Sequence, residues 1–231
     1  TDEHTLAYGE NKFNRKGNYM ESDGPEILAL EMLRGPRNGL GNINSIFVSE
    51  TTAKILFGKT DPIDKTIKID NRAAVNVTGV YKDLPFNSEF KDVGFIAPFD
   101  LHLSLSPWLR KDDWNNNHVQ VFAEIAPNTS PERISERIKD IKTNNAKNET
   151  VSWVTKFLLH PMSKWHLHEE FKQGKNVGGR IQFVWLFGII GVFVLLLACI
   201  NFMNLSTARS EKRAKEVGIR KVVGAIKSQL I

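Results

Sequence analysis

The sequence predicts an α+β fold: a mixed domain of short strands and helices, then a transmembrane α-helix, then a cytoplasmic amphipathic helix. Three observations lead to this prediction. Short β-prone runs and capped helical segments alternate through residues 1–178. Residues 183–200 then form an apolar run without one charged side chain. Residues 207–231 finally carry seven Lys and Arg against two Glu, a net charge of +5 that equals the net charge of the whole chain.

Strands are predicted where β-branched and aromatic residues cluster or alternate with polar ones between turn residues. The clearest hairpin joins Thr66–Asp70 to Ala73–Tyr81 through a turn at Asn71 and Arg72. The other predicted strands are residues 4–9, 17–22, 44–50, 118–126 and 151–159.

Three helices are predicted from their capping residues. The first covers residues 23–33, with Asp23 as its N-cap. The second begins at the N-cap Ser49 and ends at Gly58. The third lies within residues 129–142, with Ser130 as N-cap and Pro131 at the first helical position. About half a dozen strands with several helices make residues 1–178 an α+β domain.

The apolar run is long enough to cross a membrane. Extended to residues 181–205, it admits only Gln182, Asn201 and Asn204 as clearly polar members, and about 20 helical residues cross a bilayer core of roughly 30 Å. A buried core helix of a soluble protein is the alternative, and such helices are usually shorter and amphipathic. We therefore predict a transmembrane helix over residues 179–206.

Lysines and arginines near the two ends of this helix predict its orientation. Residues 207–231 carry seven of them, whereas residues 163–180 carry four, so the tail is predicted to be cytoplasmic and residues 1–178 extracytoplasmic. Gly188 and Gly191 would let another helix approach closely. Asn201 and Asn204 either bond to a neighbouring helix or face lipid headgroups.

Motifs for catalysis and cofactor binding are missing from the sequence. It contains no G-x-x-x-x-G-K-[ST], so the chain does not bind ATP through a P-loop, and no G-x-S-x-G, H-E-x-x-H or C-x-x-C. His166 and His168 alone do not make a metal site, and the adjacent Asp112 and Asp113 are typical of a solvated loop. The sequence therefore predicts no enzyme, no bound metal or cofactor, and no nucleic-acid partner.

The basic tail has two faces when drawn as a helix. Arg213, Arg220 and Lys227 fall on one line, and an apolar face that includes Gly218 and Val222 lies opposite. Gly224 is a predicted break, after which a second helix would start. Two interpretations remain open: an anchor lying on anionic lipid, or an element that docks a cytoplasmic partner.

The tail also resembles a known family. "LLLACINFMNLSTARSEKRAKEVGIRKVVGAIKSQLI", residues 195–231, resembles the signature of MacB/FtsX-like ABC transporter permeases. "SIFVSETTAKILFGKTDPIDKTIKID", residues 45–70, and "VTGVYKDLPFNSEF", residues 77–90, resemble the MacB-type periplasmic core domain. One departure is Asp64, where the family usually has Gly; if that Gly serves a turn with positive φ, Asp tolerates the backbone conformation less well.

The resemblance implies a fragment of a permease subunit in the bacterial inner membrane, multi-pass when complete, whose periplasmic domain has porter-like and sabre-like parts. A partner ATPase would bind ATP, and its hydrolysis would move the periplasmic domain (mechanotransmission) for efflux of antimicrobials or peptides, or for lipoprotein handling. The resemblance also implies a second permease copy in a homodimer or pseudo-dimer, and a periplasmic or outer-membrane partner in some members. The ATPase-facing residues it implies are Arg213, Lys215, Glu216, Val217, Gly218, Ile219, Arg220 and Lys221.

A different class remains as the alternative: a single-span membrane receptor with an extracytoplasmic sensor domain. Such receptors usually continue into heptads that pair in parallel, and Gly218 and Gly224 interrupt such a seam. Two further apolar spans downstream would indicate a permease, and their absence would indicate a receptor.

Overall fold

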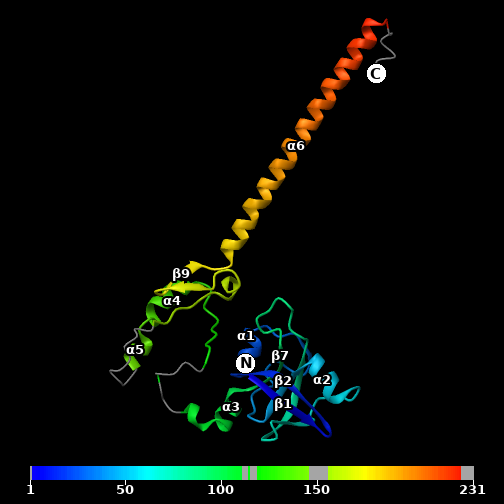
Figure 1. Cartoon of the computed structure of the whole chain (residues 1–231). Helices are drawn as coiled ribbons and strands as arrows, with labels where there is room; N and C mark the ends of the chain where they lie inside the picture. The colour runs from blue at the N-terminus through cyan, green and yellow to red at the C-terminus, as the bar shows by residue number, and fades with distance from the viewer. Residues whose placement is uncertain (1, 111–113, 115–118, 146–155, 225–231) are drawn as a thin grey trace. The chain divides into compact units, whose positions relative to one another are not determined.

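The computed structural model describes residues 2–110, 114, 119–145 and 156–224. The chain divides into two compact units, which we describe separately (Figure 1). The first comprises Thr1–Ser130 and Asp140–Thr155, and the second comprises Pro131–Lys139 and Lys156–Ile231. The predicted mixed domain followed by a long apolar helix is confirmed.

Six strands of the first unit close into a barrel. They pair in the order β6–β4–β7–β2–β1–β5, and β5 pairs again with β6 to complete the ring, while β3 pairs with the far end of β6. The β4–β6 and β2–β7 pairs are parallel and the other pairs are antiparallel. The strands are β1 (Asp2–Tyr8), β2 (Asn11–Met20), β3 (Met32–Arg34), β4 (Ser45–Ser49), β5 (Thr66–Ile69), β6 (Ala73–Tyr81) and β7 (Val93–Pro98).

Close packing inside the barrel explains the composition of its strands. Every residue of β4 and β7 is buried, whereas the first half of β6 alternates between buried and exposed positions. At Gly17, β2 passes directly over the ring of Phe95, and a Cβ atom added there would lie 2.0 Å from the ring. Phe95 itself is fully buried, so only glycine fits at this crossing.

The predicted helix after β4 is confirmed as α2 (Glu50–Phe57). The Ser49 side chain accepts a hydrogen bond from the backbone N–H of Thr52, and Gly58 follows the helix with φ 60°. The helix buries Leu56 and Phe57 in the core. The remaining helices of this unit are α1 (Gly24–Ile27), α3 (Phe99–Leu105), the 3-10 helix η1 (Pro107–Arg110) and α5 (Ile141–Asn145).

The hairpin predicted at residues 66–81 is confirmed as β5 and β6, which pair in antiparallel register. Its loop contains Asp70 and Asn71 in the left-handed region, with φ 51° and 55°. The strands predicted at residues 4–9, 17–22 and 44–50 are confirmed as β1, β2 and β4, with β2 starting earlier. Asp64 has φ 61°, so the turn before β5 does require the positive φ that a glycine would supply.

The helix predicted over residues 23–33 is wrong beyond its first turn. Helix α1 ends at Ile27, Ala29 takes a left-handed φ of 50°, and residues 32–34 form β3. Asp23 makes no side-chain capping hydrogen bond. The turn at Ala29 lets Leu30 be buried in the core and lets β3 pair with β6, and this tertiary pairing overrides the helical pattern of the segment.

The strand predicted at residues 118–126 is also wrong where it is described. Residues 119–126 have no regular secondary structure, and Val119 and Val121 are exposed. The ring of Phe122 packs edge-on against Phe90 instead. Of the strand predicted at residues 151–159, residues 156–159 have no regular structure and the rest lies outside the described residues. Alternation of apolar residues predicts a strand only when a partner strand is in reach.

The second unit contains the helix α4 (Pro131–Ile138), the 3-10 helix η2 (Met162–Lys164), the hairpin strands β8 (Glu170–Lys172) and β9 (Lys175–Gly178), and the helix α6 (Ile181–Val222). Helix α4 confirms the helix predicted at residues 129–142, which begins at Pro131 as expected but ends at Ile138. The hydroxyl of Ser135 in α4 accepts a hydrogen bond from the backbone N–H of Leu159. This bond holds α4 to the segment that leads into the hairpin.

Candidate functional site

Helix α6 contains the apolar run and is long enough to cross a membrane. Its most apolar 18-residue window has a mean hydropathy of 2.9, and none of that window is buried within the chain. No other helix of the described residues meets the same criteria of length and composition. With 42 residues, α6 is about 63 Å long, roughly twice the thickness of a bilayer core.

The basic segment continues the same helix without interruption. Helix α6 runs unbroken from Ile181 to Val222 across residues 206 and 207, where the predicted membrane span ends and the predicted cytoplasmic segment begins. Helix α6 ends at Val222, two residues before the predicted break at Gly224, where φ is 93°. The second helix predicted after Gly224 lies outside the described residues. Arg220 and Lys221 lie in the last turn of α6, where positive charge interacts favourably with the helix dipole.

The eight predicted partner-facing residues all lie on this exposed end of α6, but they do not share one face. Lys215, Gly218 and Ile219 line a shallow open groove together with Val222 and Val223. Four of these groove residues follow the i, i+3, i+4, i+7 spacing of one helix face. Gly218 contributes no side chain to this groove.

The other five residues lie elsewhere around the helix. Arg213, Glu216 and Arg220 are spaced i, i+3 and i+7 and form a polar stripe. Val217 is i+4 from Arg213 and so borders this polar stripe, and Lys221 is i+4 from Val217 on the same side of the helix. A flat partner surface therefore cannot touch all eight residues of one straight helix at once.

The four predicted helix-packing residues form two separate pairs. Gly188 and Gly191 are neighbours on one face, and Asn201 and Asn204 lie about 140° around the helix from them. A Cβ atom added at either glycine would meet no atom within 4 Å. Packing within this chain therefore gives no reason for glycine at these two positions.

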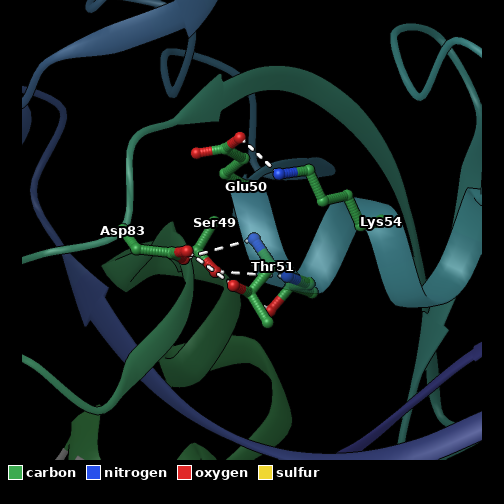
Figure 2. Close-up of polar contacts among 6 residues, drawn as sticks. Ser49, Glu50, Thr51, Lys54 and Asp83 are labelled. Carbon is green, nitrogen blue, oxygen red and sulfur yellow. Dashed lines mark hydrogen bonds and ion pairs between the residues drawn. The ribbon is translucent and has the colours of Figure 1, made fainter.

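A polar cluster in the first unit ties together the two sequence segments that resemble the periplasmic domain (Figure 2). The carboxylate of Asp83, in the loop after β6, accepts hydrogen bonds from the backbone N–H of Thr51 at 3.2 Å and from its hydroxyl at 2.5 Å. Beside this contact, the Lys54 ammonium pairs with Glu50 at 2.5 Å. Asp83 thus satisfies a free amide at the start of α2, next to the one that Ser49 caps.

The ionisation of Asp83 fits this capping role. Partial burial is the largest influence and raises the pKa of Asp83, but the hydrogen bonds from Thr51 and Ser49 and the nearby Lys54 charge together outweigh it. The net effect lowers the pKa of the carboxyl below its ordinary value. A negative charge at a helix N-terminus is favourable, so the cluster has a structural explanation without catalysis.

Sequence reasoning missed two features of the structure. Asp83 is 32 residues from Thr51, and no spacing rule links an acid to a helix start at that distance. The β8–β9 hairpin had one signal in the sequence, Gly174 between the β-favouring residues Phe171 and Val177. In the structure both turn residues, Gln173 and Gly174, take positive φ. Among the described residues, no group of three or more His, Cys, Asp or Glu is placed to hold a metal ion.

Fold and helix together define a class of protein: a membrane protein in which a mixed α/β domain precedes a membrane-spanning helix. Residues 2–141 match the family of MacB-like periplasmic core domains. The match covers more than half of the chain, so the chain belongs to this family, the periplasmic domain of MacB-like ABC transporter permeases. The resemblance seen in the sequence is confirmed.

Several solved structures are similar to the chain. A domain from Porphyromonas gingivalis, described as part of a permease, matches with a TM-score of 0.47 and 18% identity, over 71% of this chain and 77% of that one. The extracellular domain of the noncanonic ABC-type transporter YknZ from Gram-positive bacteria matches with a TM-score of 0.36 and 22% identity, over 46% of this chain and 55% of that one. The periplasmic region of MacB from Actinobacillus actinomycetemcomitans matches with a TM-score of 0.43 and 13% identity, over 62% of this chain and 65% of that one. This chain therefore covers less than two thirds of the YknZ and MacB chains. A comparison with curated proteins gives no match.

Proposed function

We propose that the chain is part of an ABC permease subunit that couples ATP hydrolysis by a partner ATPase to motion of its periplasmic domain. In this proposal residues 1–178 lie in the periplasm, α6 crosses the inner membrane, and residues 207–231 meet the ATPase in the cytoplasm. The permease works with a second copy of itself or a related subunit. Its cargo class is antimicrobials, peptides or lipoproteins, as the sequence resemblance implies.

The observation that carries the proposal is the continuity of α6. One helix of 42 residues includes both the apolar span and the basic end. An unbroken helix transmits a push or a tilt along its axis, whereas a flexible joint at residue 206 would absorb the motion. Since α6 is about twice as long as a bilayer core is thick, a substantial part of it projects beyond the membrane.

The groove face is the part of the basic end best suited to dock the ATPase. Ile219 is 57% exposed next to Gly218 in this groove, and Lys215 lines the same groove. An apolar side chain of the partner would pack into the groove, and Lys215 would pair with acidic residues at the edge of the partner's surface. Arg213, Glu216 and Arg220 would then face lipid headgroups or a second surface of the partner.

A pair of aspartate substitutions tests this docking face. Ile219→Asp places a charge in the groove, while Val217→Asp places the same charge about 160° around the helix. In the complete permease with its ATPase, we expect Ile219→Asp to abolish the dependence of transport on ATP hydrolysis and to reduce ATPase copurification at least about tenfold, the effect of roughly 1.4 kcal/mol. Val217→Asp should have the smaller effect.

The same assay also tests coupling itself. Arg220→Glu reverses a charge on the polar stripe and is expected to weaken coupling less than Ile219→Asp. Periplasmic folding, followed by resistance of residues 1–110 to proteolysis, should be unchanged in all three variants. Normal copurification and coupled activity in the Ile219→Asp permease would contradict the docking role. A stronger effect of Val217→Asp would place the docking face on the side of α6 that carries Val217.

A further inference from the structure

We infer that the segment at the outer end of α6 is a lipid-binding collar, which rests on anionic phospholipid headgroups through its lysines. The collar comprises residues 164–180: the end of η2, the turn after it, the β8–β9 hairpin and the two glycines before α6. Figure 1 shows the hairpin beside the start of α6. The inference uses only the membrane-spanning character of α6 and does not depend on ATPase coupling.

Hydrogen bonds hold the collar firmly to the helix. The backbone N–H of Ile181, the first residue of α6, donates to the carbonyl of Leu167 at 3.0 Å. The Gln182 side chain donates to the carbonyl of Val177 in β9 at 3.4 Å. The Arg180 guanidinium pairs with Glu169 at 3.0 Å. Strand β9 and the segment before β8 are therefore both bonded to the first turn of α6 or to the residue before it, and β8 is held through its pairing with β9.

Backbone geometry at Gly179 tightens the same junction. Its φ is 129°, and an added Cβ would lie 3.0 Å from the backbone nitrogen of Glu169 and 3.1 Å from the carbonyl oxygen of Leu167. The Asn176 side chain donates to the carbonyl of His168 at 2.7 Å and also accepts from the backbone N–H of Gly178. The hairpin cannot swing away from the helix without breaking several of these contacts.

The position of the apolar run sets the height of the collar. The run begins at Ile181, directly after the collar, so the hydrocarbon boundary lies within about a turn of the first helical residue. Trp185, one turn into α6, is a residue type that favours the membrane interface. A hairpin fixed to that first turn therefore lies at the level of the headgroups.

The charge of the collar suits an anionic surface. It carries Lys164, Lys172, Lys175 and Arg180 against Glu169 and Glu170, and one of those acids already pairs with Arg180. Lys172 and Lys175 flank the hairpin turn, are exposed, and have no carboxylate partner among the described residues. Phe171 and Val177 on the same hairpin are 39% and 40% exposed. Lysines with a few exposed apolar residues at headgroup height are typical of surfaces that bind anionic lipid.

Fluorescence quenching tests the contact on the full chain. Cys199→Ser removes the single native thiol, and Gln173→Cys places a fluorophore in the hairpin turn, where the residue already takes a positive φ. The chain is reconstituted in nanodiscs whose lipids carry a quencher near the headgroup, made of phosphatidylcholine alone or mixed with phosphatidylglycerol. We expect at least about twofold stronger quenching with phosphatidylglycerol, lost at about 1 M salt.

Matched variants separate charge from position. The double change Lys172→Gln and Lys175→Gln should remove the dependence on phosphatidylglycerol, whereas Lys12→Gln with Lys59→Gln, two exposed lysines of the barrel unit, should leave it unchanged. Equal quenching in both lipid compositions would overturn the inference, because the chain alone would then hold the hairpin at the surface. Absence of quenching in both lipid compositions would also overturn the inference and would favour an acidic protein partner for these lysines.

Discussion

Leu6, Val75 and Phe95 in the barrel are fully buried by strands of their own chain, whereas Phe193, Leu197 and Phe202 in α6 are 63%, 66% and 74% exposed. Both regions are rich in large apolar side chains, so composition does not distinguish them. The difference lies in what covers those side chains. The barrel closes on itself through the β5–β6 pairing, while α6 satisfies only its backbone and leaves its side chains to lipid or to neighbouring helices.

This contrast separates two sources of stability. Changes in the barrel should alter the free energy of unfolding of the first unit whatever the surroundings. Changes on α6 should alter that free energy very little and should instead affect insertion, helix packing or partner binding. The predictions below use this separation, in order of decreasing effect.

Gly17→Ala should have the largest effect. The added Cβ would lie 2.0 Å from the fully buried Phe95 ring, so strand β2 or the ring must move. We expect a loss of about 3 kcal/mol in the free energy of unfolding, the upper part of the range for overpacked cores. Urea denaturation followed by near-UV circular dichroism measures it.

Gly188→Ala is the matched control in α6, because a Cβ there meets no atom within 4 Å of the chain. It should leave the urea midpoint of the barrel unchanged. A similar loss in both variants would show that the barrel and α6 do not differ in the way proposed.

Asp83→Ala should have an intermediate effect. It removes the acceptor of two hydrogen bonds from Thr51 at the start of α2, and loss of such a cap costs about 1–2 kcal/mol. The substitution should also change the response to acid. Because the folded state lowers the pKa of Asp83, its contribution is complete above the ordinary Asp pKa of about 4 and is lost as the pH falls through the lower folded value.

Thermal unfolding at pH 7 and at pH 3 measures this response. The parent should lose stability between the two pH values, and part of that loss should be missing in Asp83→Ala. The rest of the loss comes from other acids such as Asp70, which is present in both proteins. Burial raises the pKa of Asp70, but hydrogen bonds from His4 and Thr5 outweigh burial and lower the pKa below its ordinary value. An identical acid response in parent and variant would rule out a charged capping role for Asp83.

Asp64→Gly should have the smallest effect, and of opposite sign. Asp64 takes a left-handed φ of 61°, and its backbone N–H donates to the carbonyl of Val77, which fixes this turn against β6. Glycine adopts that conformation without the Cβ clash, so we expect a gain of up to about 1 kcal/mol in calorimetry. Lys65→Gly is the control: its φ is not positive, so it should lose stability.

Several parts of the fold were predictable because local chemistry decides them. Ser49 and Gly58 bound α2, the length of the apolar run identifies α6, and the turn predicted at Asn71 and Arg72 lies in the hairpin loop, which begins one residue earlier at Asp70. Residues 23–33 were not, because burial of Leu30 and pairing of β3 with β6 are tertiary effects that a helical pattern does not reveal. Barrel closure also depends on pairings between segments far apart in the chain.

The candidate site was predictable in composition but not in geometry. The sequence identifies residues 213–221 as basic and partly apolar, and their division between two sides of α6 holds because the helix runs unbroken to Val222. Spacing along the chain does not encode contacts between distant segments. Two such contacts are the hydrogen bonds from Thr51 to Asp83 and the bond that holds the collar to Ile181.

The straightness of α6 also gives it an angular phase. Each residue between the collar and the groove at Gly218 turns the helix by about 100° and lengthens it by about 1.5 Å. One inserted residue would barely change the reach of α6 but would rotate the groove by more than a quarter turn relative to the hairpin. Seven inserted residues would restore the phase to within about 20°. The number of residues in α6 therefore fixes the direction in which its basic end faces, as well as how far it reaches.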